Sequence, residues 1–152
     1  MFKRINTGDK IRRMTSIMMP DVFVKRVIIV DDEVFLLEYL REMLEEYRLE
    51  VYTASSPERA VKIADMLAQL RRKVHLVFMD FNMPGLNGAD TVKLLKADRF
   101  KASLGQAQFT IMTAQNDALV KEKFREVGVT QFIFKPYSFE QIRDHLICHG
   151  LI

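Results

Sequence analysis

From residue 26 onward, short apolar runs alternate with stretches whose apolar positions recur at helical spacing. The β-branched run Val27-Ile28-Ile29-Val30 is typical of a buried strand. The apolar residues between Leu36 and Tyr47 lie three or four positions apart, which predicts an amphipathic helix. The same alternation continues to the end of the chain. It predicts further strands at 50–54, 74–79, 109–112 and 131–134, each followed by a helix.

Capping residues indicate where several of these helices begin and end. Ser56-Pro57 predicts a helix start, with serine as the N-cap and proline at the first helical position. Asn116 is expected to cap the helix after the fourth strand, and Gly128 is expected to end it. Ser138 is expected to cap the last helix.

Five strands, each followed by a helix, predict an α/β fold with a parallel sheet covered on both faces. Because crossover connections are right-handed, few topologies remain. The doubly wound, flavodoxin-like strand order 2-1-3-4-5 with five helices fits best, and its switch point lies between the first and third strands. Segment 98–108, after a third helix expected at 89–97, is longer than a typical connection. It is expected to form a surface loop or an extra helical turn.

Length and composition are those of one soluble globular domain. The 152 residues are 49% hydrophobic and 28% charged, which is ordinary for this class. No run approaches ~18 apolar residues, so no membrane span is expected. Cys148 is the only cysteine, which excludes an internal disulfide and favours a reducing, cytoplasmic location. His75, His145 and His149 are not spaced with Cys148 as metal ligands, and we interpret them as structural or surface residues.

Positive charge is concentrated at the N-terminus. Residues 1–26 hold seven basic and two acidic residues, a net charge of +5, whereas the remainder has a net charge of −2. We therefore expect a basic N-terminal extension at 1–25 and a globular domain at 26–152. The extension is interpreted as a disordered segment or a misplaced start, with a docking helix as the alternative and membrane-surface or nucleic-acid contact as a third. Because Ile152 follows the last helix so closely, no DNA-binding domain is expected.

Polar side chains stand where four of the five expected strands end. Asp31 and Asp32 follow the first strand, Asp80 the third, Thr113 the fourth and Lys135 the fifth. Open α/β sheets bind ligands beyond the carboxyl ends of their strands, and the switch point brings the first and third strands together. The sequence therefore predicts one site of acids, a hydroxyl and an ammonium, which suits a divalent cation and a phosphoryl group.

The acids of this site predict a magnesium ion. Clustered carboxylates repel one another and tolerate proximity best with a cation between them. Mg²⁺ suits such oxygen ligands and often shares its shell with a phosphate. Asp32 and Asp80 are expected to bind it directly and Asp31 through water. The backbone carbonyl of Asn82 is expected to contribute as well.

Three of the strand-end residues suit phosphoryl chemistry. Asp80 can act as a nucleophile toward phosphorus, because carboxylates form aspartyl-phosphate intermediates. Lys135 supplies a compact positive charge for phosphoryl oxygens, and Thr113 supplies a hydroxyl. Each residue also has a structural interpretation. Asp31 and Asp32 can cap the first helix, Thr113 can be an ordinary strand end, and Lys135 a solvated loop lysine. Only their joint occurrence at four strand ends favours the functional interpretation.

Four motifs in order resemble the receiver domain of two-component response regulators, over residues 26–148. Each motif is weak alone, and the four together are specific. They are Val30-Asp31-Asp32, Asp80-Phe81-Asn82-Met83-Pro84-Gly85-Leu86-Asn87-Gly88, Thr113-Ala114 and Phe132-Ile133-Phe134-Lys135-Pro136.

This resemblance implies a signalling switch of a phosphorelay, expected to be either a stand-alone, single-domain receiver or a receiver excised from a larger protein. Asp80 would accept a phosphoryl group from a phosphohistidine on a sensor histidine kinase or phosphotransfer protein, with Mg²⁺ required. Phe132 matches the family's aromatic switch position. Thr113 would then move toward the phosphoryl group, and Phe132 would turn inward and repack the nearby surface for a downstream target protein. The chain is expected to be a monomer or weak homodimer, and to catalyse only its own phosphorylation and dephosphorylation.

Two other classes of function stay open. A magnesium-dependent aspartyl-phosphate hydrolase uses a similar set of residues, but it expects a second aspartate two positions after the nucleophile, where this chain has Asn82. A receiver-shaped scaffold that is never phosphorylated is the third class. The complete set of expected residues argues against it.

Overall fold

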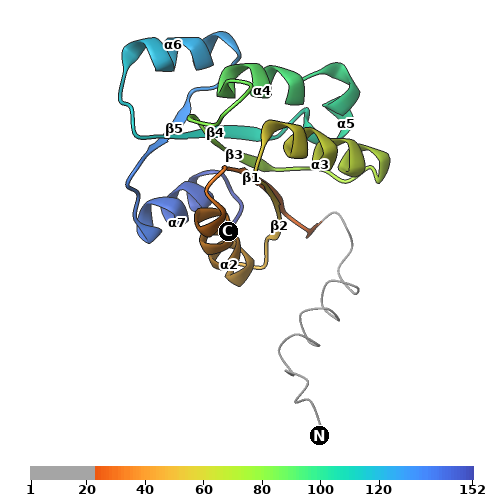
Figure 1. Ribbon diagram of the computed structural model, residues 1–152. Coiled ribbons are helices and arrows are strands. Elements are labelled where there is room, and N and C mark those ends of the chain that lie inside the picture. Colours follow the sequence, from red (N-terminus) through yellow and green to blue (C-terminus); the bar gives the residue numbers. More distant parts are fainter. Residues whose placement is uncertain (1–22) are drawn as a thin grey trace, which may run out of the picture.

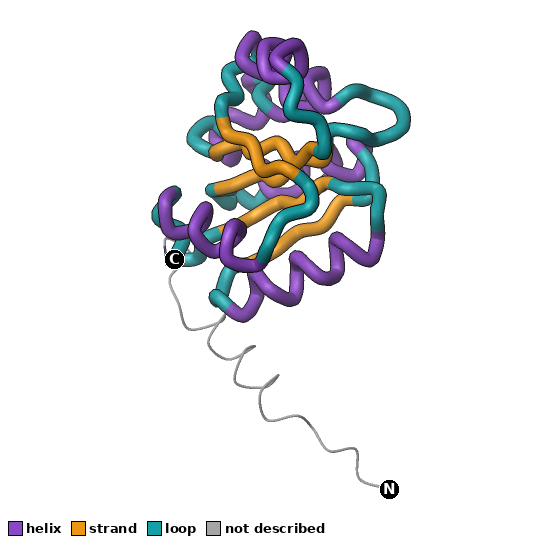
Figure 2. Tube along the Cα trace, turned by 90° about the vertical axis from the view of Figure 1, so that its left-hand side faces the viewer, coloured by secondary structure: helices purple, strands orange, loops and turns teal. Residues whose placement is uncertain are grey.

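The computed structural model describes residues 23–152, which form a parallel sheet between two layers of helices (Figures 1 and 2). The strands lie in the order β2-β1-β3-β4-β5, as the sequence predicts. The strands are β1 Arg26–Val30, β2 Glu50–Ala54, β3 Leu76–Asp80, β4 Gln108–Thr113 and β5 Gln131–Phe134. The helices are α2 Val34–Glu46, α3 Pro57–Gln69, α4 Gly88–Leu95, α5 Lys101–Leu104, α6 Ala118–Glu126 and α7 Phe139–Cys148, with a 3-10 turn η2 at Asp98–Phe100.

Two apolar clusters, one on each face of the sheet, hold the layers together. On one face Ile28 and Val30 of β1 pack with α3, α4 and α6, and on the other Val27 and Ile29 pack with α2 and α7 (Figure 1). Every residue of β1 and β3 is buried. A strand buried on both faces reads as a continuous apolar run, which is why both central strands could be predicted from the sequence.

Two of the three predicted N-caps are confirmed. Ser56 accepts a hydrogen bond from the backbone of Arg59, and Ser138 forms a capping box with Gln141. The prediction for Asn116 is wrong. The N-cap of α6 is Asp117, whose Oδ1 accepts from the backbone N–H of Leu119 at 2.8 Å. Both residue types are good N-caps, and the carboxylate of Asp117 gains more from the positive end of the helix dipole.

The prediction of five helices is also wrong, because the described residues contain six α-helices. The additional helix, α5, lies with the η2 turn in the long segment before β4, where the sequence allowed an extra helical turn. Phe100 and Leu104 are 1% and 2% exposed and pack with Leu67 and Ala64 of α3 in the same cluster. Burial of these two side chains therefore keeps the segment helical against α3.

The expectations for the basic extension concern residues 1–25, of which 1–22 lie outside the described residues. The boundary predicted at residue 25 therefore stays a prediction. Within the described part of the chain, no helix is long and apolar enough to span a membrane.

The side chain of His145 in α7 packs against one face of the sheet. Its Nε2 lies 2.7 Å from the hydroxyl of Thr110, and its ring lies 5.8 Å from Phe78 and 4.2 Å from His149 between ring centroids. Burial, with a smaller contribution from His149, lowers the pKa of His145 to about 4. The folded protein therefore favours the neutral imidazole.

This shift predicts a loss of stability in acid. An unfolded histidine has a pKa of about 6.5, so between that pH and about 4 the unfolded chain binds a proton that the folded protein does not. We expect the free energy of unfolding of the wild type, relative to that of His145→Gln, to decrease as pH falls through this window. Denaturant titrations at several pH values measure this difference, in which the carboxylates common to both proteins cancel. A difference that stays constant with pH would contradict the prediction.

Candidate functional site

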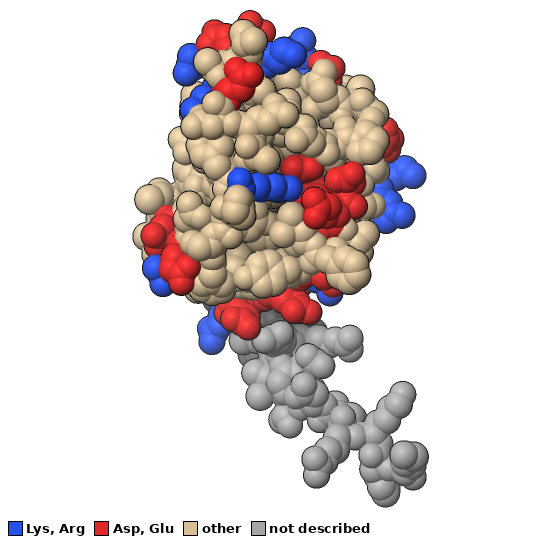
Figure 3. All heavy atoms as spheres, turned by 60° about the vertical axis from the view of Figure 1, so that its left-hand side comes forward, with Lys and Arg blue, Asp and Glu red and all other residues tan. Residues whose placement is uncertain are grey.

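The ends of four strands meet at the carboxyl edge of the sheet. In the strand register Val30 pairs with Met79, Asp80 with Met112, and Thr113 with Phe134. The last residues of β3 and β4 and the residues just after β1 and β5 therefore lie at nearly the same level. Figure 3 brings this edge forward and shows acidic side chains gathered beside a basic one.

Lys135 joins the first and third strands at this edge. Its ammonium donates to Oδ1 of Asp80 at 3.0 Å and to Oδ2 of Asp31 at 3.2 Å, although the three residues are far apart in sequence. Asp31 is fully buried and Asp80 is 5% exposed, whereas Lys135 is half-buried. Burial alone would lower the pKa of Lys135, but the hydrogen bond to Asp80 and the charges of both acids raise it above its ordinary value. Lys135 therefore stays protonated, and two carboxylates hold its ammonium in place.

Three carboxylates form the acidic part of the site. Asp31, Asp32 and Asp80 each offer an oxygen atom, and these oxygens lie within 4.8 Å of one another. Burial raises the pKa of Asp31, and the charge of Asp80 adds to this, while the backbone N–H of Glu33 and the ammonium of Lys135 oppose it. The single positive charge of Lys135 therefore does not neutralise the negative charge of the three carboxylates. An all-oxygen cluster with this excess of negative charge fits a hard divalent cation such as Mg²⁺.

The interpretation of Asp31 and Asp32 as helix caps is wrong. The N-cap of α2 is Glu33, which makes no capping bond with its side chain. Asp31 Oδ1 instead accepts from the backbone N–H of Glu33 at 2.9 Å, which fixes one carboxylate oxygen and leaves the other facing Lys135. Asp32 is exposed beside it.

Thr113 and Asn82 flank the acids. Thr113 is 1% exposed, and its hydroxyl accepts from the backbone N–H of Gln115 at 3.0 Å, so its own proton is available for a second partner. Asn82 is exposed in the loop after β3, two residues beyond Asp80.

A row of aromatic rings runs from the site to Phe132. Phe81, directly after Asp80, meets Phe124 of α6 edge-on at 5.8 Å between ring centroids, and Phe124 meets Phe132 of β5 in the same way at 6.1 Å. Phe124 is fully buried, and a Cβ at Gly88 would lie 3.0 Å from its ring. Phe132 is half-buried and packs against the same cluster. The site and the predicted switch residue are therefore in contact through packed side chains.

Tyr137 lies beside this site and was not predicted from the sequence. Its hydroxyl is buried and has no hydrogen-bond partner among the described residues. Burial raises the pKa of Tyr137, and the charge of Asp31 raises it further, so the phenol stays protonated. Tyr137 lies two positions after Lys135, past the cis peptide bond to Pro136. This closeness in sequence to a predicted site residue could have identified it.

Comparisons with known proteins agree with this geometry. The family model of the response regulator receiver domain matches residues 27–147. A probable chemotaxis protein CheY of Rhizobium etli is 29% identical over 119 residues, which cover 78% of this chain and 86% of that protein. The transcriptional regulatory protein PdtaR of Mycobacterium tuberculosis is also 29% identical over 119 residues, but these cover only 53% of its length. The structure of chemotaxis response regulator CheY4 of Vibrio cholerae superposes with a TM-score of 0.71 at 21% identity, covering 83% of this chain and 98% of that one.

Proposed function

Because this chain belongs to the response regulator receiver domain family, we propose that it is a phosphorylation-controlled switch whose acceptor is Asp80. The donor is a phosphohistidine on a sensor histidine kinase or phosphotransfer protein. The observation that carries this proposal is the double hydrogen bond of Lys135 to Asp31 and Asp80, inside a cluster of three carboxylates at the carboxyl edge of the sheet.

Asp80 is the nucleophile in this scheme. One of its oxygens forms a bond to phosphorus, the bond from phosphorus to the donor's imidazole nitrogen breaks, and the electron pair returns to that nitrogen. Asp80 is nearly buried and is held by Lys135, so its carboxylate is positioned before the donor arrives.

Asp31, Asp32, Asp80 and the backbone carbonyl of Asn82 would hold Mg²⁺. The ion, when bound, supplies the charge that neutralises the phosphoryl oxygens. Lys135 adds a fixed positive charge on the other side of Asp80, and the free proton of the Thr113 hydroxyl can bond to a phosphoryl oxygen.

The switch follows from the position of Thr113 and Phe132. Phosphorylation of Asp80 adds charge and acceptor oxygens, which draw the Thr113 hydroxyl away from the backbone of Gln115. Phe132 then turns into the space beside Phe124, and the surface made by α6, β5 and α7 changes for a downstream partner protein. Phe132 has no hydroxyl, so packing alone decides between its two positions.

The proposal predicts a metal-dependent phosphoryl adduct. The wild-type chain, mixed with a small acyl phosphate and Mg²⁺, is expected to gain one phosphoryl group in its intact-mass spectrum. The adduct should map to the peptide that contains Asp80, and it should not form when a chelator removes the metal. An adduct that forms equally with chelator, or that maps elsewhere, would contradict the proposal.

The same experiment separates the switch from a hydrolase. Asn82 stands where a hydrolase of this type needs a carboxylic acid, and its amide cannot act as an acid or base. We therefore expect no steady turnover of a free phosphomonoester. Sustained release of inorganic phosphate from such a substrate would favour the hydrolase.

A further inference from the structure

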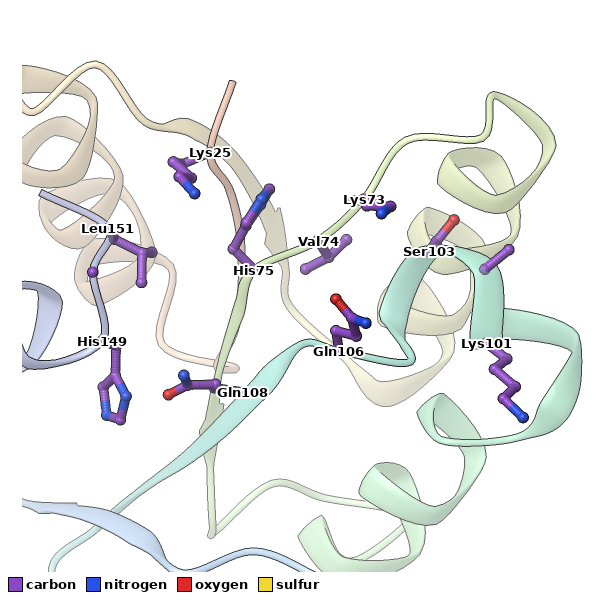
Figure 4. Close-up of a pocket in the computed structure, with 12 residues that line it drawn as sticks. Lys25, Lys73, Val74, His75, Lys101, Ser103, Gln106, Gln108, His149 and Leu151 are labelled. Carbon is purple, nitrogen blue, oxygen red and sulfur yellow. The ribbon is translucent and has the colours of Figure 1, made fainter. Parts of the chain in front are cut away.

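A pocket opens at the amino edge of the sheet, opposite the carboxylates. It has a volume of about 260 Å³, and residues from five separate segments line it. Lys25 precedes β1, Lys73 and His75 precede β3, Ser103 lies in α5, and His149 follows α7. Figure 4 shows Lys25 and His75 toward one side and Lys73 and Ser103 toward the other, with Gln106 between them.

The lining of this amino-edge pocket is basic. None of the described residues that line it is acidic. Within residues 23–152, neither Lys25 nor Lys73 forms an ion pair, whereas the nearby Arg26 and Arg72 both pair with Glu50. The ammonium of Lys101, which also lines the pocket, points away from its centre in Figure 4. Among the described lining residues, Lys25 and Lys73 are therefore the two cations available to a ligand.

His75 can only donate a hydrogen bond to a ligand here. The backbone N–H of Arg26 donates to Nδ1 of His75 at 3.1 Å, so the neutral ring carries its proton on Nε2. Burial lowers the pKa of His75, and the charges of Lys25, Arg26 and Lys73 lower it further. The ring thus lies in a region of positive potential, which favours an anion as the ligand.

Ser103 adds an unused polar group. Its side chain is 2% exposed, and its hydroxyl has no hydrogen-bond partner among the described residues. A buried hydroxyl without a partner is costly, so such groups are uncommon in folded proteins. The hydroxyl oxygen is covered as it stands, so it would reach a ligand oxygen in the pocket only after rotation about the Cα–Cβ bond of Ser103.

We propose that the amino-edge pocket binds a small phosphate-bearing anion, at a site separate from Asp80. The donors that line it are two ammoniums, the imidazole N–H of His75 and, after rotation of its side chain, the hydroxyl of Ser103, which match the several acceptor oxygens of a phosphate. The volume lies just below the usual range for ligand pockets, which favours a phosphate or diphosphate group over a whole nucleotide.

Titration of the full-length wild-type chain with inorganic pyrophosphate, in the presence of a chelator, tests this site. We expect saturable binding by calorimetry, with amide and imidazole NMR shifts centred on His75, Ser103 and Gln108. Lys73→Ala should weaken the affinity by about tenfold, because it removes a charge-assisted hydrogen bond. The matched control Lys93→Ala, on the exposed surface of α4, should leave the affinity unchanged within about twofold. Shifts confined to the basic residues before 23, or equal effects of the two lysine substitutions, would overturn the proposal.

Ser103→Ala provides a second, independent measurement. Removal of a buried hydroxyl that has no partner should leave the melting temperature without ligand unchanged or higher, and should weaken pyrophosphate binding several-fold. A lower melting temperature combined with unchanged pyrophosphate affinity would assign the hydroxyl a structural role and overturn the proposal.

Discussion

Asp80→Asn is expected to abolish phosphoryl uptake, with a loss of about 10⁴-fold or more in rate. The amide oxygen of asparagine is a far weaker nucleophile than a carboxylate, and the substitution also removes one of the three carboxylates that would hold the metal. The fold should survive, because asparagine has nearly the same shape and can still accept the hydrogen bond from Lys135. Intact-mass spectra after incubation with an acyl phosphate and Mg²⁺ measure the effect.

Asp144→Asn is the matched control for this substitution. Asp144 lies on the exposed surface of α7, where Arg143 is its one ion-pair partner among residues 23–152, and its replacement should leave the adduct at the wild-type level. An equal adduct on Asp80→Asn and on the wild type would show that another residue accepts the phosphoryl group.

Lys135→Met is expected to slow phosphorylation and, at the same time, to increase the affinity of the site for magnesium. Phosphorylation should slow by about 10²- to 10³-fold, because a fixed donor to the phosphoryl oxygens is lost. Magnesium should bind roughly three- to tenfold more tightly, since Asp31 and Asp80 lose the ammonium that now partly neutralises them. Calorimetric titration with Mg²⁺ and adduct formation over time measure the two effects separately.

A non-specific loss of structure cannot produce this pair of results, because it would weaken metal binding as well. Lys93→Met, on the exposed surface of α4, removes the same charge from the chain and should change neither property. Weaker magnesium binding in Lys135→Met would show that the lysine organises the carboxylates rather than competing with the metal.

The sequence predicted the central features because each depends on a short local pattern. Residues 27–30 of β1 and 76–79 of β3 are continuous apolar runs, and the strand order follows from five repeats of strand and helix with right-handed crossovers. Asp31, Asp80 and Lys135 could be placed together because parallel strands end at one edge, and the structure brings them within hydrogen-bonding distance.

Features that depend on side-chain packing could not be predicted in this way. Adjacent Asn116 and Asp117 are both good helix caps, so the sequence did not separate them. The contact of Phe124 with Phe81 and Phe132 joins three elements, and no spacing in the chain specifies it. The amino-edge pocket likewise depends on five segments whose lining residues have no common motif.

The strand order also gives the proposed acceptor, Asp80, and the proposed switch residue, Phe132, different freedom to move. Asp80 ends β3, which has a neighbouring strand on each side, whereas Phe132 lies on β5, which among the described strands pairs with β4 alone. Local opening of an edge strand breaks fewer hydrogen bonds than opening of a central one, so the amides of β5 should exchange with solvent faster than those of β3. The fold thus holds Asp80, the proposed acceptor, in a strand that is paired on both sides, and places Phe132, the proposed switch residue, in a strand that opens at lower cost.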